Sequence, residues 1–240
     1  MKKIFLLGAL ISLLLSGMAQ ATLTTIGTAT YNGSNYNLIW DDDNNGKSVV
    51  WLDYTNANAS LPDQQTWAAS LDAELTINLN AGYTVAWDGS WRLPETVDGV
   101  AVYGYEGDPN GDGVYTYTYG YNLSNSEMGH LFYQELGNNG RYDTNQDEQS
   151  EYGLNNKGDF ANLVQGWYWS GTRYTEHMNQ EIYWSFKTSD GYQVTNSGSF
   201  RDNGIALRTA QVSAVPVPGT VLLFAVGLTG LAAGLRKNRR

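Results

Sequence analysis

Residues 124–137 read Ser-Asn-Ser-Glu-Met-Gly-His-Leu-Phe-Tyr-Gln-Glu-Leu-Gly. Small polar residues open this segment, Glu127 stands near its start and Gly137 closes it, in the usual order of a helix cap, a first turn and a stop. Residues at helical spacing share one flank: Met128, Leu131, Phe132, Glu135 and Leu136. The segment predicts a helix that is capped by Ser124 or Asn125 and ends at Gly137.

The sequence on either side of this helix predicts strands. Short aromatic or β-branched runs lie between turn residues at 24–30, 35–40, 49–52, 87–93, 167–170, 181–187 and 204–208, with 192–194 as a further candidate. Asn32-Gly33 is a hairpin-turn signal between the first two runs. Trp67, Leu71 and Leu75 recur at helical spacing and predict a first helix over residues 63–76. Two helices followed by a late antiparallel sheet predict an α+β domain.

Composition narrows the class of protein. The 240-residue chain has a net charge of −10 and no cysteine. All 24 acidic residues but only eight of the 14 basic ones lie within residues 22–212, which leaves that region with a net charge near −16. Such a surface repels nucleic acid, because phosphate binding needs clustered Lys and Arg. Residues 22–212 are enough for one domain with a substantial core, and without cysteine it must be stabilised by packing or bound ions.

The N-terminus predicts export. Lys2 and Lys3 precede an apolar stretch, and Ala19-Gln20-Ala21 supplies the small residues that signal peptidase requires. We therefore expect residues 1–21 to be a signal peptide that is cleaved after Ala21, in preference to an uncleaved membrane helix. The domain of residues 22–212 is then expected outside the cytoplasm.

The C-terminus, residues 213–240, has three parts. Val215-Pro216-Val217-Pro218-Gly219 is followed by an apolar run from Thr220 to Leu235, about 16 residues against the roughly 20 of a membrane-spanning helix. The chain ends in a basic cluster of Arg236, Lys237, Arg239 and Arg240, which is expected to stay cytoplasmic. This tail resembles PEP-CTERM sorting signals, although Val217 stands where their commonest motif has Glu. The resemblance implies an inner-membrane anchor and processing by an exosortase-like enzyme, followed by release to the cell surface or extracellular space. The alternative is a plain membrane anchor.

A second resemblance covers most of residues 36–209. It rests on seven short segments in one order: 38–41, 50–53, 67–71, Trp91-Arg-Leu-Pro94, Ser126-Glu-Met-Gly-His-Leu-Phe132, Tyr168-Trp-Ser-Gly171 and Ala206-Leu-Arg208. They resemble the Lcl C-terminal-like domain family. The resemblance implies a C-type-lectin-like fold, with two helices flanking a twisted, mostly antiparallel sheet and long loops on one side. It implies little about activity, since most of that family is uncharacterised.

Three acidic segments have the spacing of calcium loops. Asp or Asn side chains, which can supply oxygen ligands, recur at alternate positions in each segment: Asp41, Asp43 and Asn45; Asp108, Asn110 and Asp112; and Asp143, Asn145 and Asp147. Position 12 of each loop holds Leu52, Tyr119 or Leu154 in place of the usual Glu, so another segment would have to supply a carboxylate. Ca²⁺ is the cofactor that the pattern suggests, best at Asp108, and a solvated turn is the alternative.

The remaining candidates are aromatic or titratable. Tyrosines alternate with other residues in the polar stretch before the second helix, and period two would place them on one face of a strand or hairpin as a binding surface: Tyr103, Tyr105, Tyr115, Tyr117 and Tyr119. A carbohydrate platform is one interpretation of Trp91, Arg92 and Trp169, but core positions for the tryptophans and an ion pair of Arg92 with a buried carboxylate explain them better. Glu127 and His130 have metal-ligand spacing, but a hydrogen-bonded helix face explains them better. No Gly-x-Ser-x-Gly, Walker or dinucleotide motif occurs, so no catalytic residue is assigned.

Three functional hypotheses follow. The first is an exported, non-enzymatic surface or matrix protein whose loops bind extracellular polysaccharide. The second is a passive acidic matrix component that divalent cations bridge. The third is a hydrolase with unassigned carboxylates, which would need a deep cleft with two carboxyl groups in unequal environments.

Overall fold

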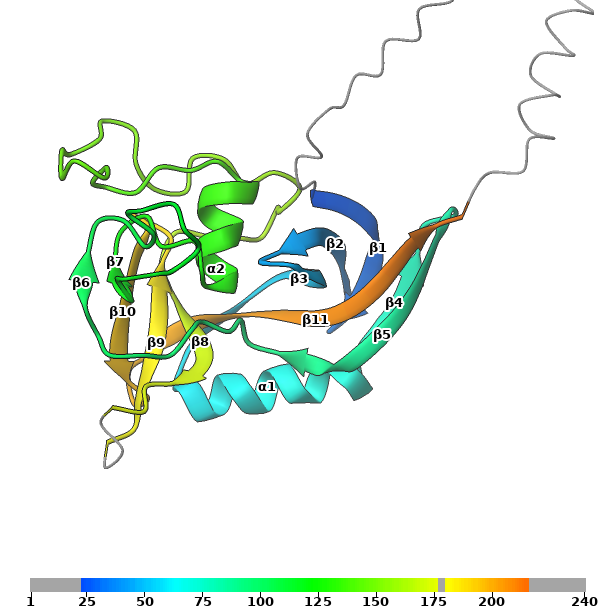
Figure 1. Ribbon diagram of the computed structural model, residues 1–240. Coiled ribbons are helices and arrows are strands. Elements are labelled where there is room, and N and C mark those ends of the chain that lie inside the picture. Colours follow the sequence, from blue (N-terminus) through cyan, green and yellow to red (C-terminus); the bar gives the residue numbers. More distant parts are fainter. Residues whose placement is uncertain (1–22, 177–179, 216–240) are drawn as a thin grey trace, which may run out of the picture.

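A computed structural model describes residues 23–176 and 180–215 (Figure 1). Three parts of the chain lie outside the described residues. They are the predicted signal peptide with Ala19 and Ala21, the short segment that contains His177, and the predicted sorting segment that follows Val215. No helix in the described residues is long and apolar enough to cross a membrane.

The N-terminal half forms the first part of a large sheet. Its elements are β1 (Leu23–Tyr31), β2 (Ser34–Asn44), β3 (Lys47–Ala59), α1 (Leu61–Glu74), β4 (Thr76–Leu79) and β5 (Tyr83–Arg92). The predicted Asn32-Gly33 turn is confirmed, since both residues have positive φ and join antiparallel β1 and β2. Strand β3 extends well beyond the predicted 49–52, because its polar C-terminal part pairs with the last strand.

The C-terminal half completes the sheet. Its elements are β6 (Tyr103–Gly104), β7 (Tyr119–Gly120), α2 (Glu127–His130), a π-helix (Leu131–Glu135), β8 (Trp167–Arg173), β9 (Ile182–Lys187), β10 (Tyr192–Ser197) and β11 (Asp202–Ala214). The strand order is β4-β1-β2-β3-β11-β8-β9-β10-β7-β6, and β5 also pairs with β11. Most pairs are antiparallel, while β8–β11 and β6–β7 are parallel, so the sheet is mixed. The predicted α+β class is confirmed, with sheet predominating.

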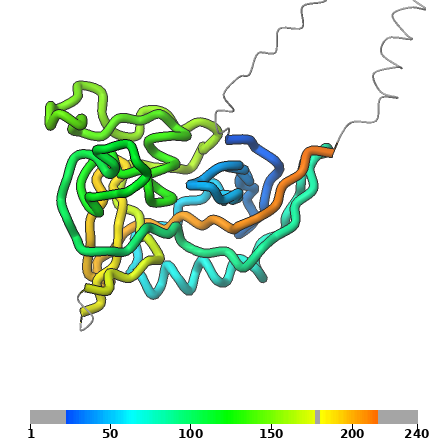
Figure 2. Tube along the Cα trace, in the orientation of Figure 1, coloured from blue at the N-terminus to red at the C-terminus, as the bar shows by residue number. Residues whose placement is uncertain are grey.

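Helices α1 and α2 lie on opposite sides of β11 (Figures 1 and 2). Neighbouring residues of each central strand accordingly enter different cores. Leu38, Val50 and Ala206 pack with α1, whereas Ile39, Trp51 and Leu207 pack with α2 and the π-helix. This alternation follows from the period of two along a strand. It confirms the prediction of two helices that flank a sheet.

The two helices start at positions other than those predicted. Helix α1 begins at Leu61 with Ser60 as its cap, two residues before the predicted start. Pro62 can lie inside its first turn, because the N–H that proline lacks has no partner within a helix at that position. The predicted cap of the second helix, Ser124 or Asn125, is wrong. Ser126 is the cap, and its hydroxyl accepts a hydrogen bond from the Gly129 N–H at 2.9 Å. After one α-helical turn the backbone changes to the wider π-helical register.

Candidate functional site

Two polar insertions lie at the end of the molecule that carries β6, β7 and β10 (Figure 1). The first connects β6 to β7, and the second, residues 138–159, follows the π-helix. Strand β7 joins the sheet through the pairing of Gln193 with Gly120, and the Gln193 side chain donates to the Thr118 carbonyl at 2.8 Å. The edge of the sheet therefore fixes the root of the first insertion.

The five predicted tyrosines do not form a hairpin face. Strands β6 and β7 pair in parallel and are two residues long, so the chain between them loops around and does not return directly. Tyr117 packs over Gly104, where any Cβ would collide with its ring. The Tyr115 ring packs over Gly107, and its hydroxyl lies 2.8 Å from that of Ser124. Local alternation predicted that all five rings share one face, but the long loop gives them different neighbours.

Three of these tyrosines belong to a larger ring cluster. Tyr103 contacts Tyr105 and Tyr119, with ring centroids 5.3 and 5.2 Å apart. The cluster continues through tyrosines that the sequence reasoning missed: Tyr121, Tyr142 and Tyr192. Tyr121 continues the alternation of the first insertion and was therefore detectable. Tyr142 and Tyr192 come from distant segments, and no local pattern connects them with the others.

A groove of about 280 Å³ opens between the two insertions. The rings of Tyr103, Tyr105 and Tyr117 line it together with Glu106 and other residues. Pro109 adds a contact from the first insertion, and Thr144 and Gln146 line the groove from the second. Tyr115 and Tyr119 do not line it. We refer to this feature as the tyrosine groove.

Two of the predicted calcium loops lie beside the tyrosine groove, because Pro109 belongs to one and Thr144 and Gln146 to the other. Asp108 accepts hydrogen bonds from the N–H groups of Asp112 and Gly113 at 3.1 and 2.7 Å. Asp143 accepts from the N–H groups of Asn145 and Asp147, both at 2.9 Å. Both are compact acidic turns. In the described residues no three His, Asp or Glu side chains form a group that could hold a metal ion.

The third predicted calcium loop is different. Asp41 is fully buried, and one of its oxygens accepts from Asn44 Nδ2 at 2.8 Å and from Trp51 Nε1 at 3.1 Å. Asn45 and Gly46 form the tight turn between β2 and β3 with positive φ. The prediction of a calcium loop at Asp41 is therefore wrong, because the hairpin turns this carboxylate into the core.

Asn122 and Tyr133 hold the two insertions together. The Asn122 side-chain amide donates to the carbonyl of Tyr105 at 2.6 Å and to that of Tyr142 at 3.0 Å, one from each insertion. Its backbone N–H donates to the Tyr133 hydroxyl at 2.9 Å, and that hydroxyl donates to the Gly191 carbonyl at 2.5 Å. Asn122 has φ of +58°, a conformation that Asn tolerates better than most residues. Burial raises the pKa of Tyr133, which keeps it neutral and able to donate.

The other candidates are structural. Trp91 and Trp169 are buried in the core, as expected. Arg92 forms a two-pronged ion pair with Glu127, with distances of 2.7 and 2.8 Å, which confirms the expected buried partner. His130 lies against Glu135, with Nε2 and Oε1 3.3 Å apart, so Glu127 and His130 have different partners.

A hollow of about 220 Å³ bears on the hydrolase hypothesis because Glu95 and Glu127 both line it. Their environments are unequal, with Glu95 half exposed and Glu127 buried. However, both Glu127 oxygens accept from Arg92, and one also accepts from the Glu95 N–H at 2.7 Å. Both oxygens of Glu127 are therefore engaged by the Arg92 guanidinium, and one also by a backbone donor, which ties this carboxylate to the fold. We therefore interpret Glu127 as a structural anion.

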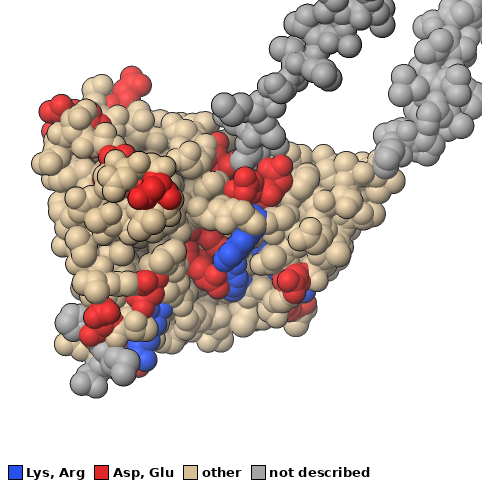
Figure 3. Space-filling view, viewed as in Figure 1, with Lys and Arg blue, Asp and Glu red and all other residues tan. Residues whose placement is uncertain are grey.

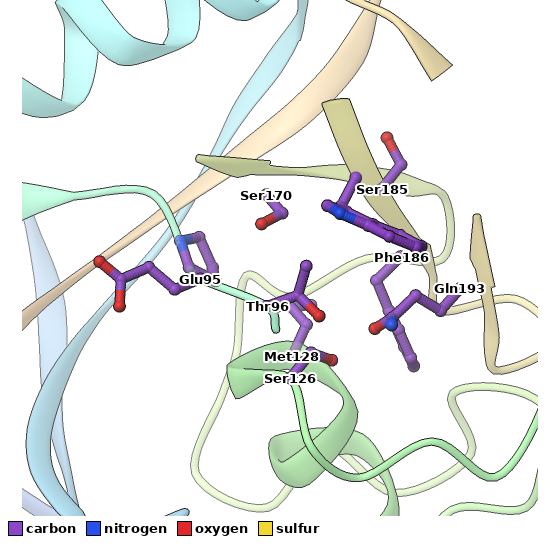
Figure 4. Close-up of a pocket in the computed structure, with 10 residues that line it drawn as sticks. Glu95, Thr96, Ser126, Met128, Ser170, Ser185, Phe186 and Gln193 are labelled. Carbon is purple, nitrogen blue, oxygen red and sulfur yellow. The ribbon is translucent and has the colours of Figure 1, made fainter. Parts of the chain in front are cut away.

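A small cavity that Thr96, Ser126 and Met128 help to line is too small for a substrate (Figure 4). Its volume is about 10 Å³, close to the space of one water molecule. Ser170, Ser185 and Gln193 line it, and the buried Thr96 hydroxyl has no protein partner among the described residues. One ordered water would satisfy that hydroxyl.

Comparisons with protein-family models, with curated proteins and with solved structures give no match to this chain. The structure itself shows the class of domain: a mixed, mostly β domain with two short helices and an aromatic groove between two insertions.

Proposed function

We propose that this is a non-enzymatic carbohydrate-binding domain of an exported surface or matrix protein, and that the tyrosine groove is its binding site. The observation that carries the proposal is the convergence of Tyr103, Tyr105 and Tyr117 in one groove with the polar side chains of Glu106 and Gln146. Aromatic rings provide apolar faces for the C–H surfaces of sugars, while carboxylate and amide groups pair with hydroxyls. Binding sites generally combine such surfaces with a few placed polar groups.

The charge around the groove indicates an uncharged polysaccharide. Among the described lining residues the only charged one is Glu106, and the two neighbouring turns carry further carboxylates at Asp108, Asp112, Asp143 and Asp147. On the face shown in Figure 3, acidic side chains are spread over the surface, and the few basic ones lie beside acidic ones. Polysaccharides rich in uronate or sulfate would be repelled.

The proposal also includes the fold family and the route of export that the sequence predicts. These are a C-type-lectin-like fold, membership of the Lcl C-terminal-like family, export through signal peptidase, and sorting of a PEP-CTERM-type tail by an exosortase-like enzyme. The mixed sheet between two helices, with long insertions on one side, is compatible with that fold. A passive acidic matrix role is the alternative, and calcium-driven self-association without sugar selectivity would favour it.

The test is calorimetric titration with a panel of neutral hexose and N-acetylhexosamine oligosaccharides. Tyr103 is the most suitable groove residue to change because it is 38% exposed and contributes least to the core. We expect Tyr103→Ala to weaken binding roughly tenfold, which corresponds to about 1.4 kcal/mol. Phe200→Ala is the matched control, since Phe200 is a 59% exposed aromatic residue that does not line the groove. Equal losses in both variants, or no binding by the unmodified chain, would refute the proposal.

A further inference from the structure

The π-helix creates a polar cluster inside the α2-side core. In a π-helix, residues five apart share one side, which brings His130 next to Glu135. Their side chains are 14% and 1% exposed, respectively. Neither the imidazole Nε2 nor either Glu135 oxygen makes a hydrogen bond of acceptable geometry within the described residues.

Strand β2 adds Asp41 and Asn44 to the same cluster. Both residues are fully buried. One Asp41 oxygen has two donors, but Asp41 Oδ1 and Asn44 Oδ1 have no donor among the described residues. The orientation of the Asn44 amide is fixed, because its Nδ2 donates both to Asp41 and to the Glu127 carbonyl at 3.2 Å. The Asn44–Glu127 hydrogen bond joins β2 to α2, the helix that ends at His130 and continues into the π-helix with Glu135.

The cluster has more acceptors than donors. The atoms without a hydrogen bond include four oxygens, on Asp41, Asn44 and Glu135, and only one nitrogen, His130 Nε2, which lies 3.3 Å from Glu135 Oε1. The other neighbours do not correct this. Trp51 is neutral and already donates to Asp41, and the nearby cations Arg92 and Lys47 are paired with Glu127 and Glu95. Two buried carboxylates therefore face at most one positive charge, an arrangement that burial strongly disfavours.

A metal ion, water or a proton could supply what is missing. The described residues contain no group of three His, Asp or Glu side chains that could hold a metal ion. Water adds donors but leaves the two negative charges in place. A proton both adds a donor and removes one charge.

We propose that Asp41, Asn44, His130 and Glu135 form a buried proton-binding site, in which a proton on Asp41 Oδ1 supplies the missing donor. We expect one of the Asn44 and Glu135 oxygens that lack a hydrogen bond to accept that proton. The site does not depend on carbohydrate binding.

The electrostatics agree with this geometry. Burial, reinforced by the charge of Glu135, raises the pKa of Asp41 from 3.8 to about 6, although Asn44, Trp51 and His130 oppose the rise. The folded state therefore binds the proton more tightly than the unfolded state. The resulting stability is fully present below pH 3.8 and is lost as the pH rises through about 6, so the unfolding equilibrium constant should rise about a hundredfold over this range.

The first experiment is a pH titration of the purified chain with ¹³C-labelled aspartate carboxyl groups, followed by NMR. We expect a carboxyl signal that titrates near pH 6 in the unmodified chain and is missing in Asp41→Asn. If every Asp carboxyl is already ionised at pH 5, the proposal is overturned. This readout on the unmodified chain holds even if the variant fails to fold.

The second experiment is denaturant unfolding of the unmodified chain and Asp41→Asn between pH 4 and 8. The amide imitates protonated Asp, since its oxygen can accept from Asn44 and Trp51 while its NH₂ group donates. We expect the two chains to be equally stable at pH 4 and the variant to be more stable at pH 8. The variant should therefore lack the loss of stability near pH 6 that the ionisation of Asp41 causes in the unmodified chain. Asp202→Asn is the matched control, because burial also raises the pKa of Asp202, outside this cluster. An Asp41→Asn variant that is less stable at every pH, together with an EDTA-sensitive unmodified chain, would indicate a metal ligand and overturn the proposal.

Discussion

The central strands β2, β3 and β11 are 11 to 13 residues long and bury apolar side chains on both faces, whereas β6 and β7 have two residues each. The central sheet is held by burial and by long hydrogen-bonded ladders. The tyrosine groove is held by a few side-chain hydrogen bonds through Asn122 and Tyr133. A rigid sheet with separately fastened insertions is a common way to position a binding surface. The two regions should therefore respond differently to substitution.

The largest effect is expected in the central sheet. Trp169 is fully buried in the α1-side core, and its indole donates to the Ala59 carbonyl at 3.1 Å. Trp169→Ala should lower the free energy of unfolding by about 3–5 kcal/mol, because it leaves a cavity and an unpaired carbonyl. Denaturant unfolding measures this loss, with Phe200→Ala as the exposed control. A loss of under about 1 kcal/mol would mean that the sheet does not depend on this core.

A smaller effect with a different signature is expected at Asn122. Asn122→Ala removes the donor to both insertions and also places Ala at positive φ, while Asn122→Gly removes the donor alone. We expect a loss of about 1–2 kcal/mol for Ala and less for Gly. Both variants should show faster amide exchange in residues 104–120 and 138–159 than in β3 and β11. If exchange accelerates equally throughout the sheet, the two regions are not separately fastened.

The smallest effect concerns calcium at the Asp108 turn. Its two carboxylates and Asn110 amide are too few for a complete site, so any binding should be weak. We expect millimolar Ca²⁺ to raise the melting temperature by a few degrees at most, reversibly with EDTA, and Asp108→Asn to abolish the rise. Asp43→Asn is the matched control, since Asp43 accepts from Gly46 in a different turn. No shift in the unmodified chain would mean that the Asp108 segment is an ordinary turn.

The same contrast separates what the sequence could predict from what it could not. The first helix, the late strands and the Asn32-Gly33 turn follow from local periodicity and turn chemistry, and all are confirmed. The π-helix after His130 was not predicted, because the apolar pattern of residues 128–136 fits an ordinary helix equally well.

The groove depended on contacts that no local pattern records. The tyrosines and both acidic turns were visible in the sequence, but their positions on two sides of one groove arise from the parallel β6–β7 pairing and from Asn122. Asp41 shows the opposite case: its spacing resembles that of a surface loop, yet the β2–β3 hairpin buries it. Long-range pairing decided both outcomes.

The most direct test of the proposed function is to map the binding site on the isotope-labelled chain by NMR, using the tightest-binding neutral oligosaccharide from the panel. We predict chemical-shift changes at residues 103–106, Tyr117 and residues 144–146, with β2, β3 and β11 unaffected. Shifts centred elsewhere on the domain, or no shifts with any neutral oligosaccharide, would refute the proposed binding site.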